Sequence, residues 1–339
     1  MKIAVLSFTS GQIDRGVETL VRELISRWEK DNQVELINAV HIDWQSLTKA
    51  WPLLKNLMMG RWHGEIFRET VKAIRKLKKF NPDVVMPVNG GWQSLLVRLY
   101  CWRYKKKMVI PGLAGLGWCD RWNLYMQPDV FVASTKRNAK WARRYNKRVR
   151  MEIIPHGVDL KRFKPEGKRR EIDLKKPIIL CVAGPDKYKR VEATIKAVAK
   201  LKRVSLLLVG GSEEMEKLGK TMLGKRFLRL RVGYKELDQV YRAADVFTMV
   251  SESSEEFGIV NLEALANGLP VVVTDDELRR ELLGEFGIYV KDVWGEEYVE
   301  KLRQALKKRK GATLPEKWLE KFSWEGIARK YEEVFKSLI

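Results

Sequence analysis

The 339-residue sequence has few residues that form disulfides or bind metals, since it contains three cysteines and three histidines. Cys101, Cys119 and Cys181 are too few and too scattered for a disulfide framework or a tetrahedral metal site. The pattern Asp-x-Asp does not occur, and three histidines are too few to indicate a metal centre. We therefore expect chemistry without a metal or another cofactor, in a reducing compartment such as the cytoplasm.

Long apolar runs are also lacking. No segment reaches the roughly 18 residues that a membrane-spanning helix requires. The sequence begins directly with a strand-like segment, residues 1–6, without the apolar core and small-residue cleavage site of a signal peptide. We expect a soluble cytoplasmic protein, with at most a peripheral association with the inner face of the membrane.

Composition and periodicity predict an α/β protein with two domains. The chain is 45% apolar and 32% charged, which is typical of a globular protein, and it is long enough for two hydrophobic cores. Strand-like and helical segments alternate in both halves, which is the pattern of a parallel sheet with right-handed crossovers. The strongest strand signals are at residues 3–6, 83–88, 107–111, 129–134, 177–184, 205–211, 228–232, 245–250 and 270–274. Two Rossmann-like domains fit this pattern.

The most informative segment lies where a predicted strand, residues 246–250, leads into a predicted helix, residues 258–267. The first backbone N–H groups of a helix lack partners within the helix, and its dipole favours negative charge, so the amides after Gly258 can hold a diphosphate. An ionised carboxylate such as that of Glu263 can accept two hydrogen bonds from a vicinal diol such as ribose. The residues expected to form this sugar-nucleotide site are Glu255, Phe257, Gly258, Ile259, Val260 and Glu263.

Glu255 and Glu263 are separated by seven residues, and Ala-Asn-Gly-Leu-Pro-Val-Val-Val-Thr follows at residues 266–274. This arrangement resembles the signature of the family-4 retaining glycosyltransferases of the GT-B fold. In that family the second glutamate holds the ribose hydroxyls and the first contacts the transferred sugar. The resemblance therefore assigns ribose binding to Glu263 and a catalytic position to Glu255. The alternative is an acidic helix N-terminus that is favoured by the dipole alone.

Two further segments resemble the same family. Residues 153–165, Ile-Ile-Pro-His-Gly-Val-Asp-Leu-Lys-Arg-Phe-Lys-Pro, look like its interdomain segment. Residues 322–325 with Tyr331 are similar to its terminal helix, which crosses back onto the first domain. The resemblance implies two domains that face a cleft. The expected limits are 1–160 for the acceptor-binding domain, 161–176 for a linker, 177–321 for the nucleotide-sugar domain and 322–339 for the C-terminal helix.

A basic segment follows the first strand of the second half. Lys189 and Arg190 match the basic side chains with which the family neutralises the leaving diphosphate, and Gly184 precedes them. Pro185, however, occupies the position where the family usually has arginine. Lys187 is a candidate substitute, although an ordinary solvated lysine explains it equally well. The resemblance makes Lys189 and Arg190 catalytic candidates.

Two segments resemble the family's pocket for the nucleotide base. One begins at Gly210 after a predicted strand, and the other contains Val232 and Tyr234. In the family these contacts are mostly made by the backbone, so the sequence does not identify the base. UDP-, GDP- and ADP-sugars all remain open as donors.

The first half carries a glycine loop after its first strand, flanked by Gly11 and Gly16. Residues 16–18, Gly-Val-Glu, resemble the family's Gly-Gly-x-Glu pattern, with Arg15 in place of one glycine. The resemblance implies a loop that faces the ligand cleft. A tight strand-to-helix turn without a ligand is the alternative, because isolated glycine patterns are weak signals.

Many family members place a histidine of the first domain beside the transferred sugar. His41, His63 and His156 all fall outside the expected loops. The corresponding loop, residues 112–122, is rich in glycine, and Asp120 is its best polar candidate as a base or a hydroxyl-positioning group. The alternative is that Asp120 caps a helix.

Positive charge is concentrated in one part of the chain. Residues 51–150 contain 22 lysines and arginines against 5 aspartates and glutamates, so they carry +17 of the total +22. Nine of the twelve tryptophans precede residue 160. Basic and aromatic side chains together suit an anionic membrane surface, where each Lys or Arg contributes about 1 kcal/mol. The densest patch contains Trp92, Trp102, Lys105, Lys106 and Lys107.

A thermophile-like composition or a nucleic-acid partner could also account for this charge. A thermophile-like composition is rich in charged residues, but it predicts mixed signs within a segment. Nucleic acid would be attracted by the same cations, yet no nucleic-acid-binding motif is present, so we expect no nucleic-acid partner. We favour an anionic membrane or a lipid-phosphate acceptor at the cytoplasmic membrane face.

Taken together, the motifs predict a metal-independent retaining hexosyltransferase that moves a sugar from a nucleotide-sugar donor to an acceptor hydroxyl. A nucleotide-sugar 2-epimerase of the same fold is one alternative, although such an enzyme would gain nothing from a basic, aromatic acceptor face. A second alternative is a non-catalytic protein that binds a sugar nucleotide or lipid, which Pro185 and the absent histidine leave open.

Overall fold

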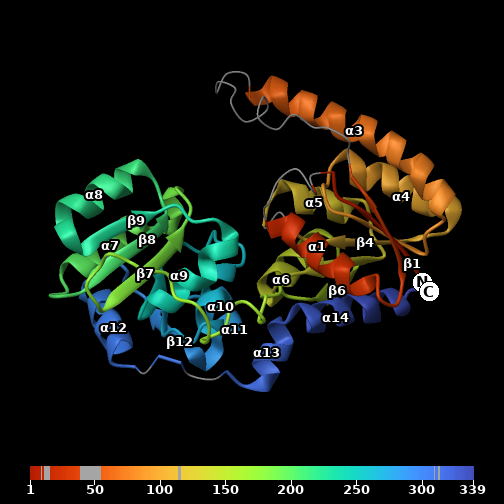
Figure 1. Ribbon diagram of the computed structural model, residues 1–339. Coiled ribbons are helices and arrows are strands. Elements are labelled where there is room, and N and C mark those ends of the chain that lie inside the picture. The colour runs from red at the N-terminus through yellow and green to blue at the C-terminus, as the bar shows by residue number, and fades with distance from the viewer. Residues whose placement is uncertain (9, 11–15, 39–54, 114–115, 309, 312–313) are drawn as a thin grey trace. The chain divides into compact units, whose positions relative to one another are not determined.

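A computed structural model describes residues 1–8, 10, 16–38, 55–113, 116–308, 310–311 and 314–339 (Figure 1). The chain forms two compact units. Unit 1 consists of Met1–Gly157 and Trp324–Ile339, and unit 2 consists of Val158–Ser323. Gly11, one of the two glycines expected to flank a ligand loop, lies outside the described residues.

Unit 1 contains a six-stranded parallel sheet with the strand order β2-β1-β3-β4-β5-β6. Its strands are β1 (Lys2–Leu6), β2 (Gln33–Ile37), β3 (Val84–Pro87), β4 (Lys107–Pro111), β5 (Val130–Ala133) and β6 (Arg150–Ile153). Its helices are α1 (Gly16–Trp28), α3 (Lys55–Phe80), α4 (Trp92–Tyr104), α5 (Trp118–Tyr125), α6 (Lys136–Tyr145) and α14 (Trp324–Lys336).

Helices cover both faces of the unit 1 sheet because the side chains of its inner strands are apolar on both sides. Along β1, Ile3 and Val5 pack with α1 and α14, whereas Ala4 and Leu6 pack in the core beneath α3, α4, α5 and α6. Successive side chains of a strand point to opposite faces, so a strand covered on both sides is a continuous apolar run. The strand β1 can therefore be recognised in the sequence as an apolar run.

Unit 2 repeats the design with a second six-stranded parallel sheet in the order β12-β11-β10-β7-β8-β9. Its strands are β7 (Ile178–Ala183), β8 (Ser205–Gly210), β9 (Phe227–Leu230), β10 (Val246–Met249), β11 (Val271–Thr274) and β12 (Gly287–Val290). Its helices are α7 (Val191–Ala199), α8 (Glu213–Leu223), α9 (Leu237–Ala243), α10 (Ile259–Ala266), α11 (Glu277–Leu283), α12 (Glu296–Lys307) and α13 (Glu316–Phe322). Short 3₁₀ turns are η2 (Lys187–Lys189), η3 (Gly224–Arg226), η4 (Tyr234–Glu236) and η5 (Gly284–Phe286).

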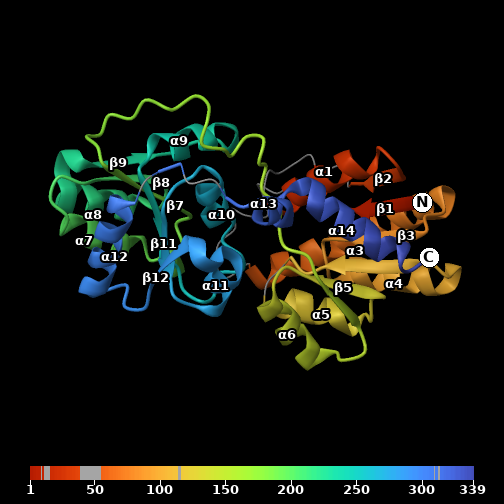
Figure 2. The same cartoon turned by 90° about the horizontal axis from the view of Figure 1, so that it is seen from below.

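The unit 2 sheet also separates two cores, and Figure 2 shows its helices on both sides. Ile178 and Leu180 of β7 pack with α9, α10, α11 and α13, while Ile179 and Cys181 pack with α7 and α12. The predicted α/β class and the two Rossmann-like halves are therefore confirmed.

The C-terminal helix α14 returns to unit 1, as the sequence predicted. Trp28 of α1 is fully buried against Tyr331 and Phe335 of α14, and its Nε1 donates to the carbonyl of Ala328 at 3.1 Å. Gly157 packs so closely on Trp324 that a Cβ at residue 157 would lie 2.5 Å from the indole. The two segments that resemble the family's interdomain segment and terminal helix thus meet in space.

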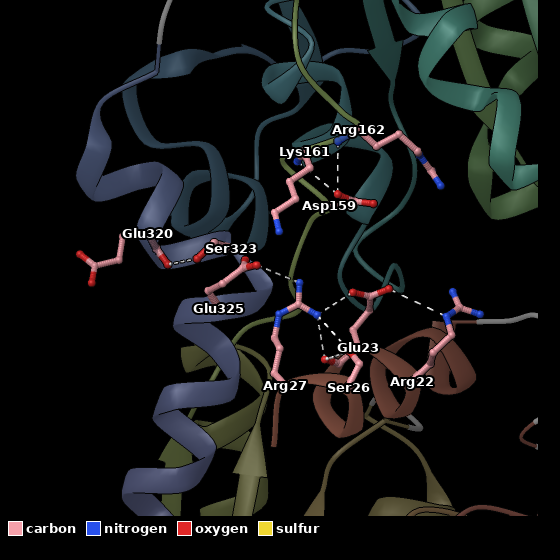
Figure 3. A network of polar contacts seen from close by, with 10 residues as sticks. All are labelled: Arg22, Glu23, Ser26, Arg27, Asp159, Lys161, Arg162, Glu320, Ser323 and Glu325. Atoms are coloured by element: carbon pink, nitrogen blue, oxygen red, sulfur yellow. Dashed lines mark hydrogen bonds and ion pairs between the residues drawn. The ribbon is translucent and has the colours of Figure 1, made fainter. Parts of the chain in front are cut away.

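Ion pairs add to the junction of α1 and α14. Arg27 of α1 lies between Glu23 of the same helix, at 2.8 Å, and Glu325 of α14, at 3.1 Å (Figure 3). Next to this junction the chain passes between the units twice, and the backbone N–H of Val158 donates to the carbonyl of Phe322 at 2.7 Å. The two crossing segments therefore run side by side.

Three strands of the structure were missing from the sequence prediction, and all three lie at a sheet edge. They are β2 and β6 of unit 1 and β12, which makes the second sheet six-stranded where five strands were expected. Edge strands have one unpaired side and admit polar residues, as in the Arg-Met-Glu-Ile of β6. Their apolar signal is therefore weaker than that of the inner strands.

Candidate functional site

The candidate site of unit 2 lies at the carboxyl edge of its sheet. β10 and β8 flank β7 in the strand order, and all three strands run parallel. The loops that follow them, residues 184–190, 211–212 and 250–258, therefore leave the same edge. Ligands of open α/β sheets bind at this edge.

Lys189 and Glu255 form the central contact of this edge. The Nζ atom of Lys189 donates to Oε2 of Glu255 at 2.5 Å, and the two side chains are only 14% and 9% exposed. The backbone N–H of Glu252 also donates to the carbonyl of Tyr188 at 2.8 Å, which joins the two loops. The structure thus brings together two side chains that the sequence placed in separate motifs.

The remaining basic candidates of the first loop differ in exposure. Arg190 has a left-handed backbone, with φ of 51°, and its Nε lies 3.5 Å from Oε1 of Glu252. Lys187 is exposed, and Gly184 is partly buried at the end of β7. Lys189 and Arg190 are therefore both paired with a carboxylate of the β10 loop.

The turn into α10 requires glycine. Gly258 has φ of 73° and ψ of 50°, a left-handed conformation that other residues rarely adopt. A Cβ at residue 258 would lie 2.8 Å from Nδ2 of Asn261. Ile259 and Val260 follow as the first turn of α10, whose N–H groups face the same edge of the sheet, and Phe257 before them is buried.

Asn261 is a polar residue of this turn that the sequence analysis missed. Its side chain is 1% exposed, and neither Oδ1 nor Nδ2 has a hydrogen-bond partner within the described part of the chain. Buried amides without a partner are costly, so this one is a candidate for ligand binding. The sequence does contain a signal for Asn261, because it is a small polar residue in the first turn of a helix that was expected to bind phosphate.

Replacing Gly258 by alanine is expected to lower the free energy of unfolding by about 1–2 kcal/mol, because the new Cβ meets Asn261 and the left-handed backbone becomes strained. The displaced α10 turn should also weaken nucleotide binding. Thermal unfolding and calorimetric titration measure the two effects. Gly284→Ala is the matched control: it has φ of 52° and no neighbour within 4 Å of the new Cβ, so it should destabilise the fold without changing nucleotide affinity.

A buried arginine supports the loop that carries Glu255. Arg279 of α11 is 1% exposed, forms an ion pair with Asp276, and donates through Nη2 to the Ser251 hydroxyl and, at 3.2 Å, to the carbonyl of Glu252. An arginine that binds a loop carbonyl fixes the loop in position. The sequence analysis did not single it out because its partners lie 27 and 28 residues away.

Glu263 lies inside the same unit and is only 1% exposed. Its Oε2 accepts a hydrogen bond from the hydroxyl of buried Tyr241 at 3.0 Å. Burial raises the pKa of Glu263 from 4.5 to about 7, and this rise outweighs the lowering by Tyr241, Arg162 and Tyr234. Glu263 therefore changes its charge near neutral pH.

Arg162, which acts on the pKa of Glu263, is another residue that the sequence analysis missed. Its guanidinium packs against two neighbouring rings, 4.3 Å from the ring centre of Phe163 and 4.0 Å from that of Tyr234, and its Nε lies 3.7 Å from Oδ1 of Asp238. The turn that positions it is held by Asp159, whose Oδ1 accepts from the N–H groups of residues 161 and 162 (Figure 3). The segment expected to be only a linker thus supplies a cation beside the predicted ribose site.

The predicted base segments lie next to a charged recess of about 490 Å³. Arg229 lines the recess and connects it to the segment that begins at Gly210. It donates to the carbonyls of Gly210 at 2.6 Å and residue 211 at 2.9 Å, and it pairs with Glu216 at 2.8 Å. Val232, which follows Arg231 of the lining in the sequence, is partly buried. The residues that line the recess are Glu213, Glu216, Lys217, Lys220, Arg229 and Arg231.

The unit 1 candidates lie at the carboxyl edge of its own sheet. Asp120 is 3% exposed in the first turn of α5, and its Oδ1 accepts from Nδ2 of Asn123 at 3.2 Å. Asn123 in turn accepts from the Ser94 hydroxyl at 2.6 Å. Asp120 therefore belongs to a buried polar network. The other unit 1 candidate, Gly16, is the first residue of α1.

The predicted acceptor face is spread over α4 and the start of β4. Trp92 and Trp102 are 42% and 58% exposed, and Lys105 is exposed at the left-handed end of α4. Lys106 and Lys107 are partly buried, because β4 begins at residue 107. The two tryptophans, more than the last two lysines, dominate this surface.

No group of three or more His, Cys, Asp or Glu side chains that could hold a metal ion occurs in the described ranges. Those ranges also contain no helix that is long and apolar enough to cross a membrane. The groups of unit 2 that could bind an anionic ligand are the lysines, arginines and helix N–H groups described above.

Comparison with known proteins gives matches over both parts of the chain. Residues 163–321 match the family model of glycosyl transferases group 1. The chain is 30% identical to sulfoquinovosyl transferase SQD2 of Arabidopsis thaliana over 51% of its length and 37% of that protein. It is 31% identical to a GDP-mannose-dependent alpha-mannosyltransferase of Mycobacterium tuberculosis over 63% of its length and 61% of that protein. The chain thus spans little more than a third of the first of these relatives.

Solved structures match almost the whole chain. Sucrose-phosphate synthase from Thermosynechococcus elongatus has a TM-score of 0.70 at 20% identity, covering 99% of this chain and 98% of that one. The Anabaena protein HepE in complex with UDP and glucose has a TM-score of 0.73 at 16% identity, covering 99% and 100%. The fold is therefore GT-B. The family model covers 159 of the 339 residues, and all of them lie in unit 2.

Proposed function

We propose that this chain is a retaining, metal-independent glycosyltransferase that moves a hexose from a nucleotide-sugar donor to an acceptor hydroxyl. The observation that carries the proposal is the Lys189–Glu255 pair beside the first turn of α10, at the carboxyl edge of the unit 2 sheet. A cation, a carboxylate and free helix N–H groups at one edge are what a nucleoside diphosphate sugar requires.

The residues of unit 2 divide into contacts for each part of the donor. The N–H groups of α10 with Lys189 and Arg190 bind the diphosphate, and Glu255 binds the hydroxyls of the transferred sugar. Glu263 accepts hydrogen bonds from the ribose, while Gly210, Val232 and Tyr234 surround the base.

Transfer then depends on stabilising the departing diphosphate. Positive charge that is already in place lowers the barrier as negative charge develops on the leaving oxygen. The acceptor hydroxyl approaches on the same face of the sugar. As its oxygen bonds to the anomeric carbon, the bond from that carbon to the diphosphate breaks and the proton passes to the departing phosphate oxygen, so no side-chain nucleophile is needed. Asp120 orients that hydroxyl through its buried network with Asn123.

The domain roles follow from this division. Residues 1–160 bind the acceptor, residues 177–321 bind the donor, residues 161–176 connect them, and residues 322–339 fasten the chain end to the first domain. The match of residues 163–321 to the group 1 family supports donor binding in the second half. Gly16 belongs to the loop assigned to the ligand-facing edge of the first half.

The acceptor proposed is lipid-linked or phosphate-bearing and is presented at the cytoplasmic face of a membrane. The +17 charge of residues 51–150 supports an anionic acceptor. One similar protein, 29% identical over 42% of this chain, is named as a mannosyltransferase acting on phosphatidylinositol monomannoside, which is such a lipid. UDP-, GDP- and ADP-sugars are all retained as donors, because the base contacts proposed above are mainly backbone.

A nucleotide screen tests the proposal. Wild-type protein and the variant Glu263→Gln are heated with UDP, GDP, ADP and their common sugar conjugates. A ligand at a hundredfold excess over its dissociation constant stabilises the fold by about 2.7 kcal/mol, which gives a readable shift in Tm. If one nucleotide stabilises the wild type and stabilises the Glu263→Gln variant less, the result supports the proposed donor site.

The outcomes also separate the alternative functions. Product analysis of the stabilising sugar nucleotide distinguishes transfer or slow hydrolysis from an epimerised nucleotide sugar, which would indicate a 2-epimerase. Binding without any turnover would indicate a non-catalytic protein. Absence of stabilisation by every nucleotide would contradict the proposed function.

A further inference from the structure

Helix α4 is apolar on both of its faces. Val97 and Tyr100 of the inner face pack in the core of unit 1. On the outer face Trp92, Leu99 and Trp102 are 42%, 48% and 58% exposed. A helix that is hydrophobic all round is normally buried on all sides. Among the described residues Trp92 packs edge to face on Phe67 of α3, with ring centres 5.6 Å apart, whereas Leu99 and Trp102 remain about half exposed.

The exposed apolar residues gather on the helical layer that contains α4. Of the fifteen large hydrophobic side chains that are exposed in the described ranges, ten lie on α3, α4, α5 and α6 or just before α5. Trp118 at the start of α5 is the most exposed of these ten, at 66%, and Tyr125 and Tyr145 lie near it. Figure 2 shows α5 and α6 side by side. Isolated exposed hydrophobic residues are ordinary, but a concentration on one layer marks an interaction surface.

Arginines are stacked on these exposed rings. The guanidinium of Arg98 lies 4.8 Å from the ring centre of Trp102. That of Arg121 lies 5.4 Å from Trp118, 5.6 Å from Tyr125 and 4.9 Å from Tyr145. Arg98 also pairs with Asp129 at 2.9 Å and its side chain is only 12% exposed, so its charge is already balanced within unit 1. Arg121 is therefore the cation that this surface presents beside its exposed rings. This combination suits the depth at which a bilayer changes from acyl chains to phosphates.

We propose that the outer surface of α4, α5 and α6 docks on an anionic lipid bilayer. This docking surface is defined by Trp92, Leu99, Trp102, Trp118, Tyr125 and Tyr145. The inference deepens the proposed function and rests on it for its purpose, since docking would bring the acceptor domain to a lipid-linked acceptor.

Charge decides between the bilayer and competing occupants. Two copies of this surface would bring together segments that each carry +17, and the repulsion opposes a symmetric dimer. Nucleic acid would need open ring faces for base stacking, but Arg98 and Arg121 already cover faces of Trp102 and Trp118. A surface of anionic phosphates above an apolar layer satisfies the cations and the exposed leucine at the same time.

Co-sedimentation with vesicles tests the docking surface. Wild-type protein is mixed with vesicles of phosphatidylcholine alone or with added phosphatidylglycerol, at low and high salt. Strong binding is expected only with phosphatidylglycerol. The double variant Leu99→Ser/Trp102→Ser should weaken this binding at least about tenfold, because both side chains are exposed in the free protein and buried in the bilayer.

Unit 2 offers a matched control. Trp294 is 54% exposed, and the ammonium of Lys196 lies 5.7 Å from its ring centre, so it reproduces an exposed tryptophan with a cation outside the docking surface. Trp294→Ser should bind vesicles like the wild type. Arg121→Gln tests the second cluster and should also weaken binding, whereas Lys196→Gln should not.

Specific results would overturn the inference. Equal binding to both vesicle types would exclude an anionic surface, and unchanged binding of the Leu99→Ser/Trp102→Ser variant would exclude α4 as the docking element. A concentration-dependent dimer in sedimentation velocity that this variant abolishes would assign the surface to a second copy. Thermal unfolding of each variant shows that it is folded. Nucleotide binding without vesicles is measured on the same samples, so a failure of the donor site is distinguished from a failure of docking.

Discussion

Replacing Lys189 by methionine is expected to lower the turnover number by roughly 10²- to 10³-fold, the usual cost of removing one group that stabilises developing negative charge. Methionine keeps much of the length of the side chain but removes the ammonium that lies 2.5 Å from Glu255 and faces the proposed diphosphate site. Steady-state kinetics with the nucleotide sugar found in the screen measures the loss.

The variant also leaves Glu255 without this cation in a site where its side chain is only 9% exposed. Removing one partner of a buried ion pair destabilises a protein by about 3–5 kcal/mol. A loss of activity could therefore reflect a loss of fold. The double variant Lys189→Met/Glu255→Gln separates the two effects, because it removes both charges.

Stability and turnover should respond differently in this double variant. We expect its Tm to return toward the wild-type value while its turnover stays low, since neither the cation nor the sugar-binding carboxylate is restored. Recovery of turnover with stability would assign the pair a structural role only. Lys196→Met is a control, because Lys196 pairs with Glu192 at 2.6 Å on the exposed side of α7.

The inner strands and the turn before α10 could be predicted because their determinants are local. β7, β8 and β10 are buried on both faces and appear as apolar runs, and Gly258 marks a strand-to-helix turn. The return of α14 was predicted from its resemblance to a known helix, not from its apolar pattern. Edge strands such as β6 were not predicted, because half of the residues of β6 are exposed to solvent and its apolar pattern is weak.

The pairing of site residues could not be predicted from the sequence because it depends on strand order. Lys189 and Glu255 are 66 residues apart and meet only because β7 and β10 are neighbours in the sheet. Arg162 falls in the predicted linker, and nothing in a basic segment indicates that one guanidinium packs against both Phe163 and Tyr234. Arg279 likewise has the pattern of a surface residue of an amphipathic helix, yet it is buried beneath the β10 loop.

Glu263→Gln is expected to weaken nucleotide binding and to stabilise the free protein at alkaline pH. A hydrogen bond to a charged group contributes about 1.5–3 kcal/mol, so affinity at pH 8 should fall roughly 10- to 150-fold. Glutamine keeps the shape of the side chain and still accepts from the hydroxyl of Tyr241. Calorimetric titration and chemical denaturation measure affinity and stability.

The opposite sign of the stability effect follows from the pKa of Glu263, which burial raises from 4.5 to about 7. The favourable contribution of the protonated group is complete below pH 4.5 and is lost as the pH rises through about 7, where the folded protein must ionise a buried carboxyl group. A shift of this size corresponds to about 3 kcal/mol. The variant lacks this loss, so its advantage over the wild type should grow between about pH 4.5 and about 7 and stay constant above that.

Nucleotide affinity of the wild type should change with pH in the opposite direction. Ribose hydroxyls donate to the ionised carboxylate, so binding should weaken by about tenfold per pH unit below about 7. Glu263→Gln should show no such dependence. A wild-type affinity that is flat between about pH 6 and 8 would contradict the assignment of Glu263 to the ribose.

Arg162 sets where this transition falls. The charged and titratable groups that act on Glu263 are Tyr241 of α9, Tyr234 of η4 and Arg162, and all three lower its pKa against the larger effect of burial. Arg162→Gln should therefore raise the pH at which affinity is half lost, while Arg170→Gln, which removes the exposed pair with Glu236, should leave it unchanged. If Arg162 acts only through packing against Phe163 and Tyr234, affinity will fall equally at every pH and the midpoint will not move. Direct titration of the Glu263 carboxyl by NMR, assigned with the glutamine variant, gives the same test without any nucleotide, so it holds even if the donor differs from those screened.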